Sequence, residues 1–210
     1  MSDCPRIRLL SIDAHPLLRE GIAAIVNNQP DMQLVAQAMN GQRGIESFRK
    51  DRPDVTLMDL GLPDMSGVDT LLAIRSEFPE ARIIILTTFE GDFYVQRALE
   101  AGARGYLLKT MPHNELVDAI RQVHAGRKSI ATALASRLAE HLADEALTRR
   151  ESEVLRLVGA GYRNRQVSEM LFISEETVKI HMKHVLDKLG ATHRTQAVAI
   201  AISRGIIQIE

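Results

Sequence analysis

Residues 172–190 read FISEETVKIHMKHVLDKLG, and this stretch carries the signals of a complete amphipathic helix. Ser174 is a favourable N-cap residue, because its hydroxyl oxygen can accept a hydrogen bond from a free backbone N–H of the first turn. Gly190 can end the helix, because glycine adopts the left-handed conformation without strain. We therefore predict a helix over residues 174–189. Its apolar face is formed by four residues at helical spacing: Val178, Met182, Val185 and Leu189.

The opposite face of this helix carries a residue that folding alone does not explain. Ile180 is apolar, yet it lies between Lys179 and Lys183 on the face that we expect to meet solvent. One interpretation is an ordinary surface helix with a stray isoleucine, and this helix by itself does not decide against it. The other is a DNA major groove, where Ile180 could contact a thymine methyl group. The two lysines could then contact phosphates or guanine edges.

The residues before this helix favour the DNA interpretation. Residues 148–158 begin with Thr148 and Glu151 at the spacing of a capping box, which predicts a helix start. A second, shorter helix is predicted within residues 161–171, followed by a tight turn. This order of helices is typical of a helix-turn-helix. The residues of the second helix that we expect to point inward are Val167, Met170 and Leu171.

Residues 147–207 resemble, nearly end to end, the LuxR-type helix-turn-helix domain. The resemblance is specific because it involves many positions at a constant spacing. It implies an all-α, four-helix DNA-binding domain whose recognition helix, about 174–189, enters the major groove. It also implies that the last helix, about 194–204, can pair two protomers. The residues that it places at the DNA are Lys179, Ile180 and Lys183 in the groove and Asn164, Arg165 and Lys188 near the sugar–phosphate backbone.

The N-terminal half alternates short apolar runs with helical patterns. The predicted strands are residues 7–12, 33–38, 55–58, 82–88 and 105–109. The predicted helices are residues 17–28, 41–51, 67–77, 92–101 and 113–125. Strands that are apolar throughout and alternate with helices are typical of a parallel sheet covered on both faces. We therefore predict a flavodoxin-like, doubly wound α/β domain with a five-stranded parallel sheet.

Polar residues end four of the predicted strands: Asp13, Asp59, Thr87 and Lys109. In a doubly wound sheet, ligands bind at the carboxyl ends of the strands, so we expect these residues to share one crevice. A single Asp after a strand is more often a cap or turn residue, but four polar groups at matching ends favour a site. They permit phosphoryl transfer to Asp59 beside a divalent cation, with Lys109 as a fixed cation and Thr87 as a hydroxyl donor.

Residues 6–126 resemble the receiver domain of response regulators, and the whole chain matches the NarL/FixJ type. The resemblance implies phosphorylation of Asp59 by a sensor histidine kinase, followed by reorientation of Thr87 and Tyr106. We expect three segments: a receiver domain over residues 1–126, a helical linker over 127–146 and a LuxR-type domain over 147–210.

The sequence departs from the receiver pattern after the first strand. Receivers usually carry two adjacent acidic residues there, whereas Asp13 is followed by Ala14. By position, Ala14 replaces the carboxylate that touches the magnesium ion directly. Magnesium prefers octahedral oxygen ligation, and this chain offers Asp59, a main-chain carbonyl near Gly61 and Asp13 through water, so we expect weakened Mg²⁺ binding. We do not expect His15 to compensate, because imidazole is a poor magnesium ligand.

Ala14 leaves three interpretations open. Asp59 is phosphorylated with a weaker metal requirement, or a partner or ligand controls the receiver in place of phosphorylation, or Ala14 is an engineered change. A less favoured alternative is an enzyme that transfers phosphate through Asp59. The sequence places no second acidic group beside Asp59 as a general acid, and it contains no Walker loop or dinucleotide-binding motif. We therefore predict a regulator and not an enzyme.

Charge, cysteine content and hydropathy limit the partners. Residues 1–127 carry 14 Lys and Arg against 17 Asp and Glu, and residues 148–210 carry 10 against 7, so the basic C-terminal half is the one suited to DNA. The single cysteine, Cys4, excludes a disulfide or a Cys-based metal site within one chain. No apolar run has the length of a membrane span. We expect a cytoplasmic transcription regulator that binds a roughly palindromic DNA site as a homodimer, without membrane contact.

Overall fold

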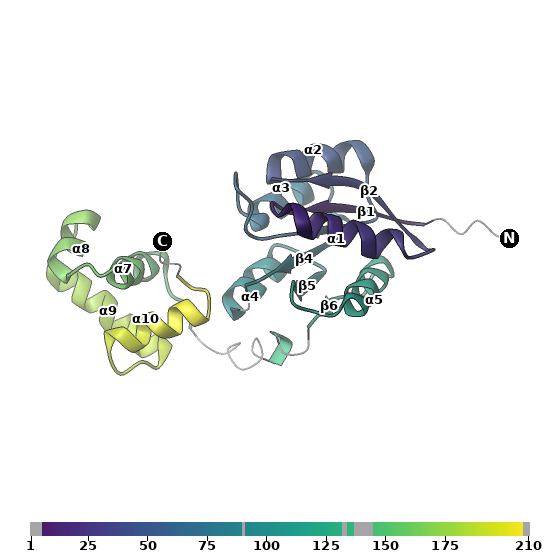
Figure 1. Cartoon of the computed structure of the whole chain (residues 1–210). Helices are drawn as coiled ribbons and strands as arrows, with labels where there is room; N and C mark the ends of the chain where they lie inside the picture. Colours follow the sequence, from purple (N-terminus) through teal and green to yellow (C-terminus); the bar gives the residue numbers. More distant parts are fainter. Residues whose placement is uncertain (1–5, 90, 132–133, 137–144, 208–210) are drawn as a thin grey trace. The chain divides into compact units, whose positions relative to one another are not determined.

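The computed structural model describes residues 6–89, 91–131, 134–136 and 145–207, which form two compact units. Figure 1 shows that the N-terminal unit is built around a sheet and that the C-terminal unit is helical. Cys4 and residues 137–144 of the predicted linker lie outside the described residues. Among the described residues, no helix combines the length and the apolar character that a bilayer crossing requires.

The N-terminal unit is a doubly wound α/β fold around a parallel sheet, as predicted. The sheet has six strands in the order β2-β1-β3-β4-β5-β6. The strands are β1 (Ile7–Ile12), β2 (Met32–Ala38), β3 (Val55–Met58), β4 (Ile83–Thr87), β5 (Gly105–Leu108) and β6 (Ser129–Ile130). The helices between and after the first five strands are α1 (Pro16–Asn27), α2 (Gly41–Asp51), α3 (Gly67–Glu77), α4 (Asp92–Glu100) and α5 (His113–His124).

The prediction of five strands was one too few. Ser129 and Ile130 pair in parallel with Gly105 and Tyr106, and they extend the sheet beyond β5. Two residues are too short to show an alternating pattern in the sequence. They form a strand because the edge of β5 offers unpaired backbone groups, which accept hydrogen bonds such as the one from the Ser129 N–H to the Arg104 carbonyl at 3.0 Å. These two residues therefore form a strand and not the start of a linker helix.

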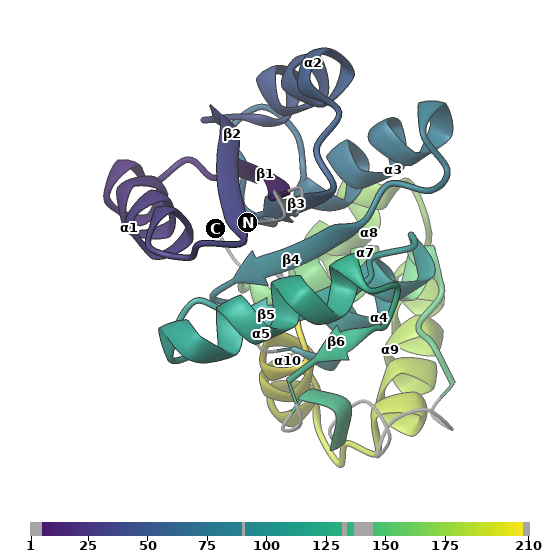
Figure 2. The ribbon, with the colours of Figure 1, turned by 90° about the vertical axis from the view of Figure 1, so that its right-hand side faces the viewer.

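Helices cover both faces of the sheet, so the central strands β3 and β4 are buried along their whole length. Helices α1 and α5 lie side by side on one face, and α2 and α3 lie together on the other (Figure 2). Ile22 of α1 and Ile120 of α5 pack with Leu9 and Ile84 of the sheet in one buried cluster. Burial on both faces explains why the strands lack the alternation of a half-exposed sheet.

The described residues 145–207 of the C-terminal unit contain the four predicted helices. They are α7 (Arg149–Gly159), α8 (Asn164–Leu171), α9 (Glu175–Leu189) and α10 (Arg194–Ser203). The Thr148 and Glu151 capping box is present at the start of α7. Ser174 caps α9 by accepting a hydrogen bond from the Thr177 N–H, and Gly190 ends it with φ 61°. The local signals therefore define both ends of the predicted recognition helix.

The core of this unit contains the apolar face of α9. Val178, Met182 and Val185 are buried among side chains of α7, α8 and α10, as the helical spacing predicted. Met170 of α8, which we expected to point inward, is 48% exposed. Because the inward face of α9 is used for packing, its opposite face is left for other contacts.

Candidate phosphoacceptor site and nucleic-acid interface

Three of the predicted site residues meet at the carboxyl end of the sheet. Asp13 and Asp59 follow the adjacent strands β1 and β3 and are 2% and 4% exposed. The Lys109 Nζ lies 2.7 Å from Asp13 Oδ2 and 2.8 Å from Asp59 Oδ2. One lysine therefore bridges two buried carboxylates, which would otherwise repel each other.

This arrangement leaves an excess of negative charge when all three groups are ionised. Two carboxylates outnumber the one ammonium group, so the site suits a further cation or a phosphoryl group that arrives together with one. Lys109 is held by both carboxylates and is only 10% exposed, so its charge is positioned before any ligand arrives. Such preorganised charge is what a phosphoryl-transfer site needs.

Thr87 and Tyr106 are connected through the main chain of Phe89. Both side chains are fully buried, in β4 and β5 respectively. The Phe89 N–H donates to Thr87 Oγ1 at 3.4 Å, and the Tyr106 hydroxyl donates to the Phe89 carbonyl at 2.8 Å. A displacement of the Thr87 hydroxyl would therefore be transmitted to Tyr106 through the main chain of Phe89.

The loop after β3 approaches the Asp59 carboxylate closely. A Cβ atom added to Gly61 would lie 3.8 Å from Asp59 Oδ2, which places the main chain of Gly61 beside this carboxylate. The Gly67 N–H donates to the Leu60 carbonyl at 2.9 Å and closes the loop. The main chain of Gly61 is therefore close to Asp59, and its carbonyl as a metal ligand stays a prediction.

The ligand set for magnesium is incomplete by one carboxylate. Ala14 offers no side-chain oxygen, and its neighbour His15 turns toward Asp13. The His15 N–H donates to Asp13 Oδ1 at 2.8 Å, and the ring Nδ1 lies 3.1 Å from the same oxygen. Asp13, His15 and Asp59 each offer one ligand atom, and these atoms lie within 4.8 Å of one another. The residues present can hold a metal, with a histidine nitrogen near the two carboxylates.

The outward face of α9 carries the predicted groove residues. Lys179 and Lys183 are exposed, and Ile180 between them is 49% exposed. Lys179 forms an exposed ion pair with Glu176 at 3.0 Å. Exposed pairs of this kind contribute little to stability, so Lys179 can exchange Glu176 for another anion.

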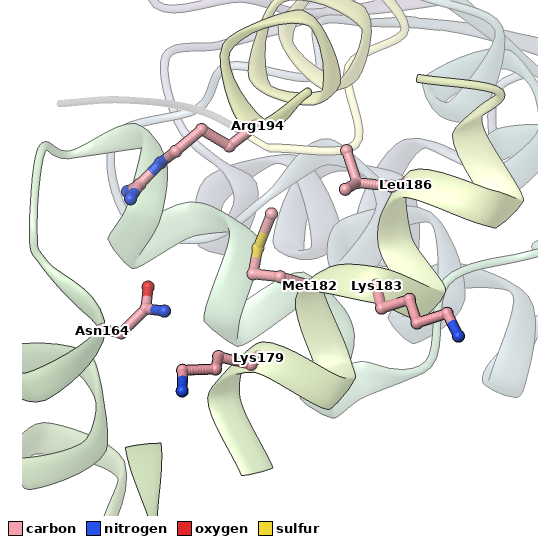
Figure 3. A pocket seen from close by; sticks show the side chains of 6 residues that line it. All are labelled: Asn164, Lys179, Met182, Lys183, Leu186 and Arg194. Carbon is pink, nitrogen blue, oxygen red and sulfur yellow. The ribbon is translucent and has the colours of Figure 1, made fainter. Parts of the chain in front are cut away.

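A hollow of about 220 Å³ lies next to these lysines. Figure 3 shows that its side chains come from α8, α9 and α10. Its lining consists of Asn164, Lys179, Met182, Lys183, Leu186 and Arg194. Arg194 was not among the predicted DNA-binding residues, although a cation at the first position of the last predicted helix is a signal that the sequence contains. Three cations around one hollow suit a polyanionic ligand.

The two remaining predicted contacts differ in their surroundings. Arg165 is exposed and pairs with Glu169 at 3.1 Å. The Lys188 side chain is only 12% exposed, and its Nζ lies 3.0 Å from Glu151 Oε2 and 3.2 Å from Glu145 Oε1. Lys188 is therefore engaged inside the domain, and this geometry does not favour the backbone contact that the resemblance implies.

The pKa shifts of this pair both favour the charged forms of the two side chains. Burial acts to raise the pKa of Glu151, but hydrogen bonds from the Thr148 N–H and from Lys188 outweigh burial and lower it. The hydrogen bond to Glu151 raises the pKa of Lys188, with a smaller opposing effect of desolvation. The pair joins the start of α7 to the end of α9.

Comparison with known families agrees with both halves of the geometry. The family model of the response regulator receiver domain matches residues 9–121, and the model of the bacterial regulatory proteins of the luxR family matches residues 145–201. This chain belongs to the LuxR family of response regulators. This response regulator is therefore a two-component, DNA-binding transcription regulator, as predicted. Members of the family are DNA-binding transcription regulators, which favours the expectation that the chain is not an enzyme.

Relatives match this response regulator over almost its whole length. It is 41% identical to the uncharacterized transcriptional regulatory protein YxjL of Bacillus subtilis (strain 168), with 97% of this chain and 98% of YxjL covered. It is 38% identical to the transcriptional regulatory protein LiaR of the same organism, with 93% and 96% covered. These relatives give no support to the alternative of control by a partner in place of phosphorylation.

Solved structures of response regulators share the fold. The response regulator ChrA of a heme-sensing two-component system is 34% identical, with a TM-score of 0.58 and 97% of this chain and all of that chain covered. The response regulator RcsB in a complex with DNA has a TM-score of 0.72 at 23% identity, with 94% and 98% covered, and shows the fold alone.

Proposed function

We propose that this response regulator accepts a phosphoryl group on Asp59 from a sensor histidine kinase, and that phosphorylation controls DNA binding by α9. The observation that carries this proposal is the Lys109 ammonium, which lies between two buried carboxylates at 2.7 and 2.8 Å. A buried nucleophilic carboxylate beside a fixed cation is the arrangement that phosphoryl transfer to aspartate needs.

The transfer forms one bond and breaks one bond. An Asp59 carboxylate oxygen attacks phosphorus, and the bond from phosphorus to the donor nitrogen of a phosphohistidine breaks. Lys109 is positioned to stabilise the phosphoryl oxygens as negative charge shifts onto them. A divalent cation, when bound, neutralises further charge on these oxygens. Asp13, Asp59 and a main-chain carbonyl near Gly61 would hold it.

Thr87 would transmit the phosphorylation of Asp59 to the rest of the receiver. Its hydroxyl would turn to donate a hydrogen bond to the phosphoryl group and would give up the contact with the Phe89 N–H. Because the Phe89 carbonyl accepts from the Tyr106 hydroxyl, this change alters how Tyr106 is held. We propose Thr87 and Tyr106 as the residues that couple phosphorylation to the face of the receiver near β5.

Intact-mass analysis tests the phosphoacceptor. The protein is incubated with a small phosphodonor, with and without Mg²⁺, beside Asp59→Asn. We expect a gain of one phosphoryl group that is absent in Asp59→Asn. The matched control is Asp54→Asn, in the loop before the same strand. A gain that persists in Asp59→Asn would show that another residue is the acceptor.

The DNA interface that we propose is the outward face of α9 with the neighbouring ends of α8 and α10. Support comes from the exposure of Lys179, Ile180 and Lys183 and from the cationic hollow beside them. Ile180 would contact a base edge in the major groove, and the lysines would contact phosphates or guanine edges. Asn164, Arg165 and Arg194 would contact the sugar–phosphate backbone.

Pairing through α10 would set two recognition helices on one DNA. Support comes from its exposed side, where Thr195 and Ala199 are exposed and Ile202 is 46% exposed. The RcsB protein has been solved as two dimers bound to two parallel DNAs. A symmetric dimer would place its α9 helices about 34 Å apart, one DNA turn, which favours a roughly palindromic site.

Footprinting on a DNA site selected from random sequence tests the interface. We expect Lys179→Ala combined with Lys183→Ala to abolish the footprint while the circular dichroism spectrum stays the same, because both side chains are exposed. The matched control is Lys50→Ala combined with Lys128→Ala, two exposed lysines of the receiver. A footprint that survives the first double substitution would contradict the assignment of α9.

A further inference from the structure

The phosphoacceptor site lacks one direct oxygen ligand, yet it keeps both of its buried carboxylates. Ala14 stands where the receiver pattern places an acidic residue, and its methyl group cannot bind a metal. Lys109 contacts Oδ2 of Asp13 and Oδ2 of Asp59. The other oxygen of Asp13, Oδ1, is turned toward His15. The position next to Ala14 is therefore where an additional ligand would complete a metal site.

His15 is the side chain that reaches this position. It is the N-cap residue of α1, but its side chain makes no capping hydrogen bond, and Pro16 follows it at the first helical position. The imidazole is thus not needed to start the helix. Its side chain is 70% exposed, and its Nδ1 lies 3.1 Å from Asp13 Oδ1. It can move by a small rotation without disturbing the core.

The distances are compatible with one shared ion. The ligand atoms of Asp13, His15 and Asp59 lie within 4.8 Å of one another. Two ligands bound to the same ion at about 2.0–2.2 Å are separated by roughly 3.3–3.6 Å in tetrahedral geometry. A movement of at most about 1.5 Å is then needed, which rotation of the exposed His15 imidazole can supply. The contact between His15 and Asp13 does not by itself require Asp59, which follows a different strand, to lie within 4.8 Å of His15.

The identity of the ligands determines which metals the site suits. Magnesium demands near-octahedral oxygen ligation and binds imidazole poorly. Zinc and cobalt accept one nitrogen and two carboxylate ligands readily, and their affinity for such sites exceeds that of earlier divalent ions. Replacing a carboxylate by an imidazole therefore changes the preferred metal and does not only weaken the site.

We propose that His15 replaces the missing carboxylate as a metal ligand, so that Asp13, His15 and Asp59 bind a divalent transition metal of the cobalt or zinc class. The proposal rests on the proposed function, because it concerns the cation that accompanies phosphorylation of Asp59. The expectation that His15 does not restore Mg²⁺ binding is kept, because the proposal concerns a different class of metal.

Calorimetric titration of the full chain with Co²⁺ and with Mg²⁺ tests the ligand set. We expect His15→Ala to weaken Co²⁺ binding by about ten-fold or more and to leave Mg²⁺ binding unchanged, by analogy with the loss of a group that supports a metal site. We expect Ala14→Asp to strengthen Mg²⁺ binding. The control is His124→Ala at the end of α5. Equal Co²⁺ affinity in the parent protein and in His15→Ala would overturn the proposal.

Pulsed electron paramagnetic resonance of bound Cu²⁺, a paramagnetic ion that accepts imidazole readily, gives a readout that affinity does not. A coordinated imidazole produces a nitrogen-14 modulation. We expect this signal in the parent protein and in His124→Ala, and its absence in His15→Ala. A signal that persists in His15→Ala would assign the nitrogen to another residue and overturn the proposal. Intact-mass analysis of His15→Ala with Mg²⁺ and a phosphodonor keeps the two proposals apart, because a gain at Asp59 leaves the proposed function standing.

Discussion

Two lysines of the recognition helix should have opposite roles, and substitution of each by methionine separates them. Lys183 is exposed, lines the hollow beside α9 and has no ion-pair partner among the described residues. Lys188, five residues later, contacts Glu151 and Glu145 at 3.0 and 3.2 Å. Methionine keeps most of the apolar stem and removes the charge. We expect Lys183→Met to change DNA binding and Lys188→Met to change stability.

The expected loss of stability follows from the surroundings of Glu151. This carboxylate is 4% exposed, and without Lys188 it keeps the hydrogen bond from the Thr148 N–H at 2.8 Å. Loss of one hydrogen bond to the buried Glu151 carboxylate should cost about 1.5 kcal/mol, the lower end of the range for charged groups. This corresponds to roughly ten-fold faster amide exchange in α7 and α9, if exchange reports the opening equilibrium.

The expected change in DNA binding follows from counterion release. Each phosphate contact contributes about 0.9 to the slope of log affinity against log salt concentration. If Lys183 contacts one phosphate in each protomer of a dimer, Lys183→Met lowers the slope by about 1.8. Lys188→Met should leave the slope unchanged. A duplex of arbitrary sequence is sufficient for this titration, because the effect does not depend on base contacts.

The assays are hydrogen exchange with mass spectrometry on the full chain and fluorescence anisotropy of labelled DNA across a salt series. The reasoning would be refuted if Lys188→Met lowered the salt slope as much as Lys183→Met and left exchange in α7 unchanged. That outcome would mean that Lys188 leaves Glu151 to contact the DNA backbone, as the family resemblance implies.

Three further outcomes concern pH, loop packing and the coupling residues. The pKa of Glu151 is lowered from 4.5 in the folded protein. The ionised carboxylate therefore contributes stability that is fully present above pH 4.5 and is lost as the pH falls through the lower folded pKa. Urea unfolding at a series of acidic pH values measures this loss. Gly67→Ala should destabilise the receiver by about 1–3 kcal/mol in thermal unfolding, because the added methyl group would meet the main chain of Asp59 and Leu60. Gly21→Ala should stabilise the receiver by about 0.5–1 kcal/mol, because Gly21 lies inside α1 with open space around it. Tyr106→Phe should cost about 1 kcal/mol through loss of one buried hydrogen bond, and it should reduce the effect of phosphorylation on DNA affinity without preventing phosphorylation, which intact mass and anisotropy measure separately.

Local signals in the sequence were sufficient for most of the secondary structure. The predicted strands at 7–12 and 55–58 and the predicted helices at 41–51 and 67–77 have the bounds found in the structure. These elements are defined by apolar runs, by N-caps such as Asn40 and Ser66, and by loop residues. Such signals involve residues within one or two turns of each other, so they can be recognised without knowledge of the fold.

The predicted convergence of Asp13, Asp59 and Lys109 used one rule about the fold in addition to the sequence. Ligand sites lie at the carboxyl ends of parallel strands, and this rule applies once the alternation of strands and helices predicts such a sheet. The structure adds that one ammonium group contacts both carboxylates, which depends on the lengths of side chains from three strand ends. No spacing in the sequence contains this distance.

The sequence by itself determined the two kinds of domain and the order of most of their elements, because these depend on periodicity and on local caps. Only the tertiary structure decided the sixth strand, the ion-pair partners of Lys188 and the place of Arg194 beside the hollow. The strand exists because β5 has a free edge, and Lys188 meets Glu151 across 37 residues of chain. The cause is the same in each case, since a partner brought close by the fold competes successfully with the local preference of the residue.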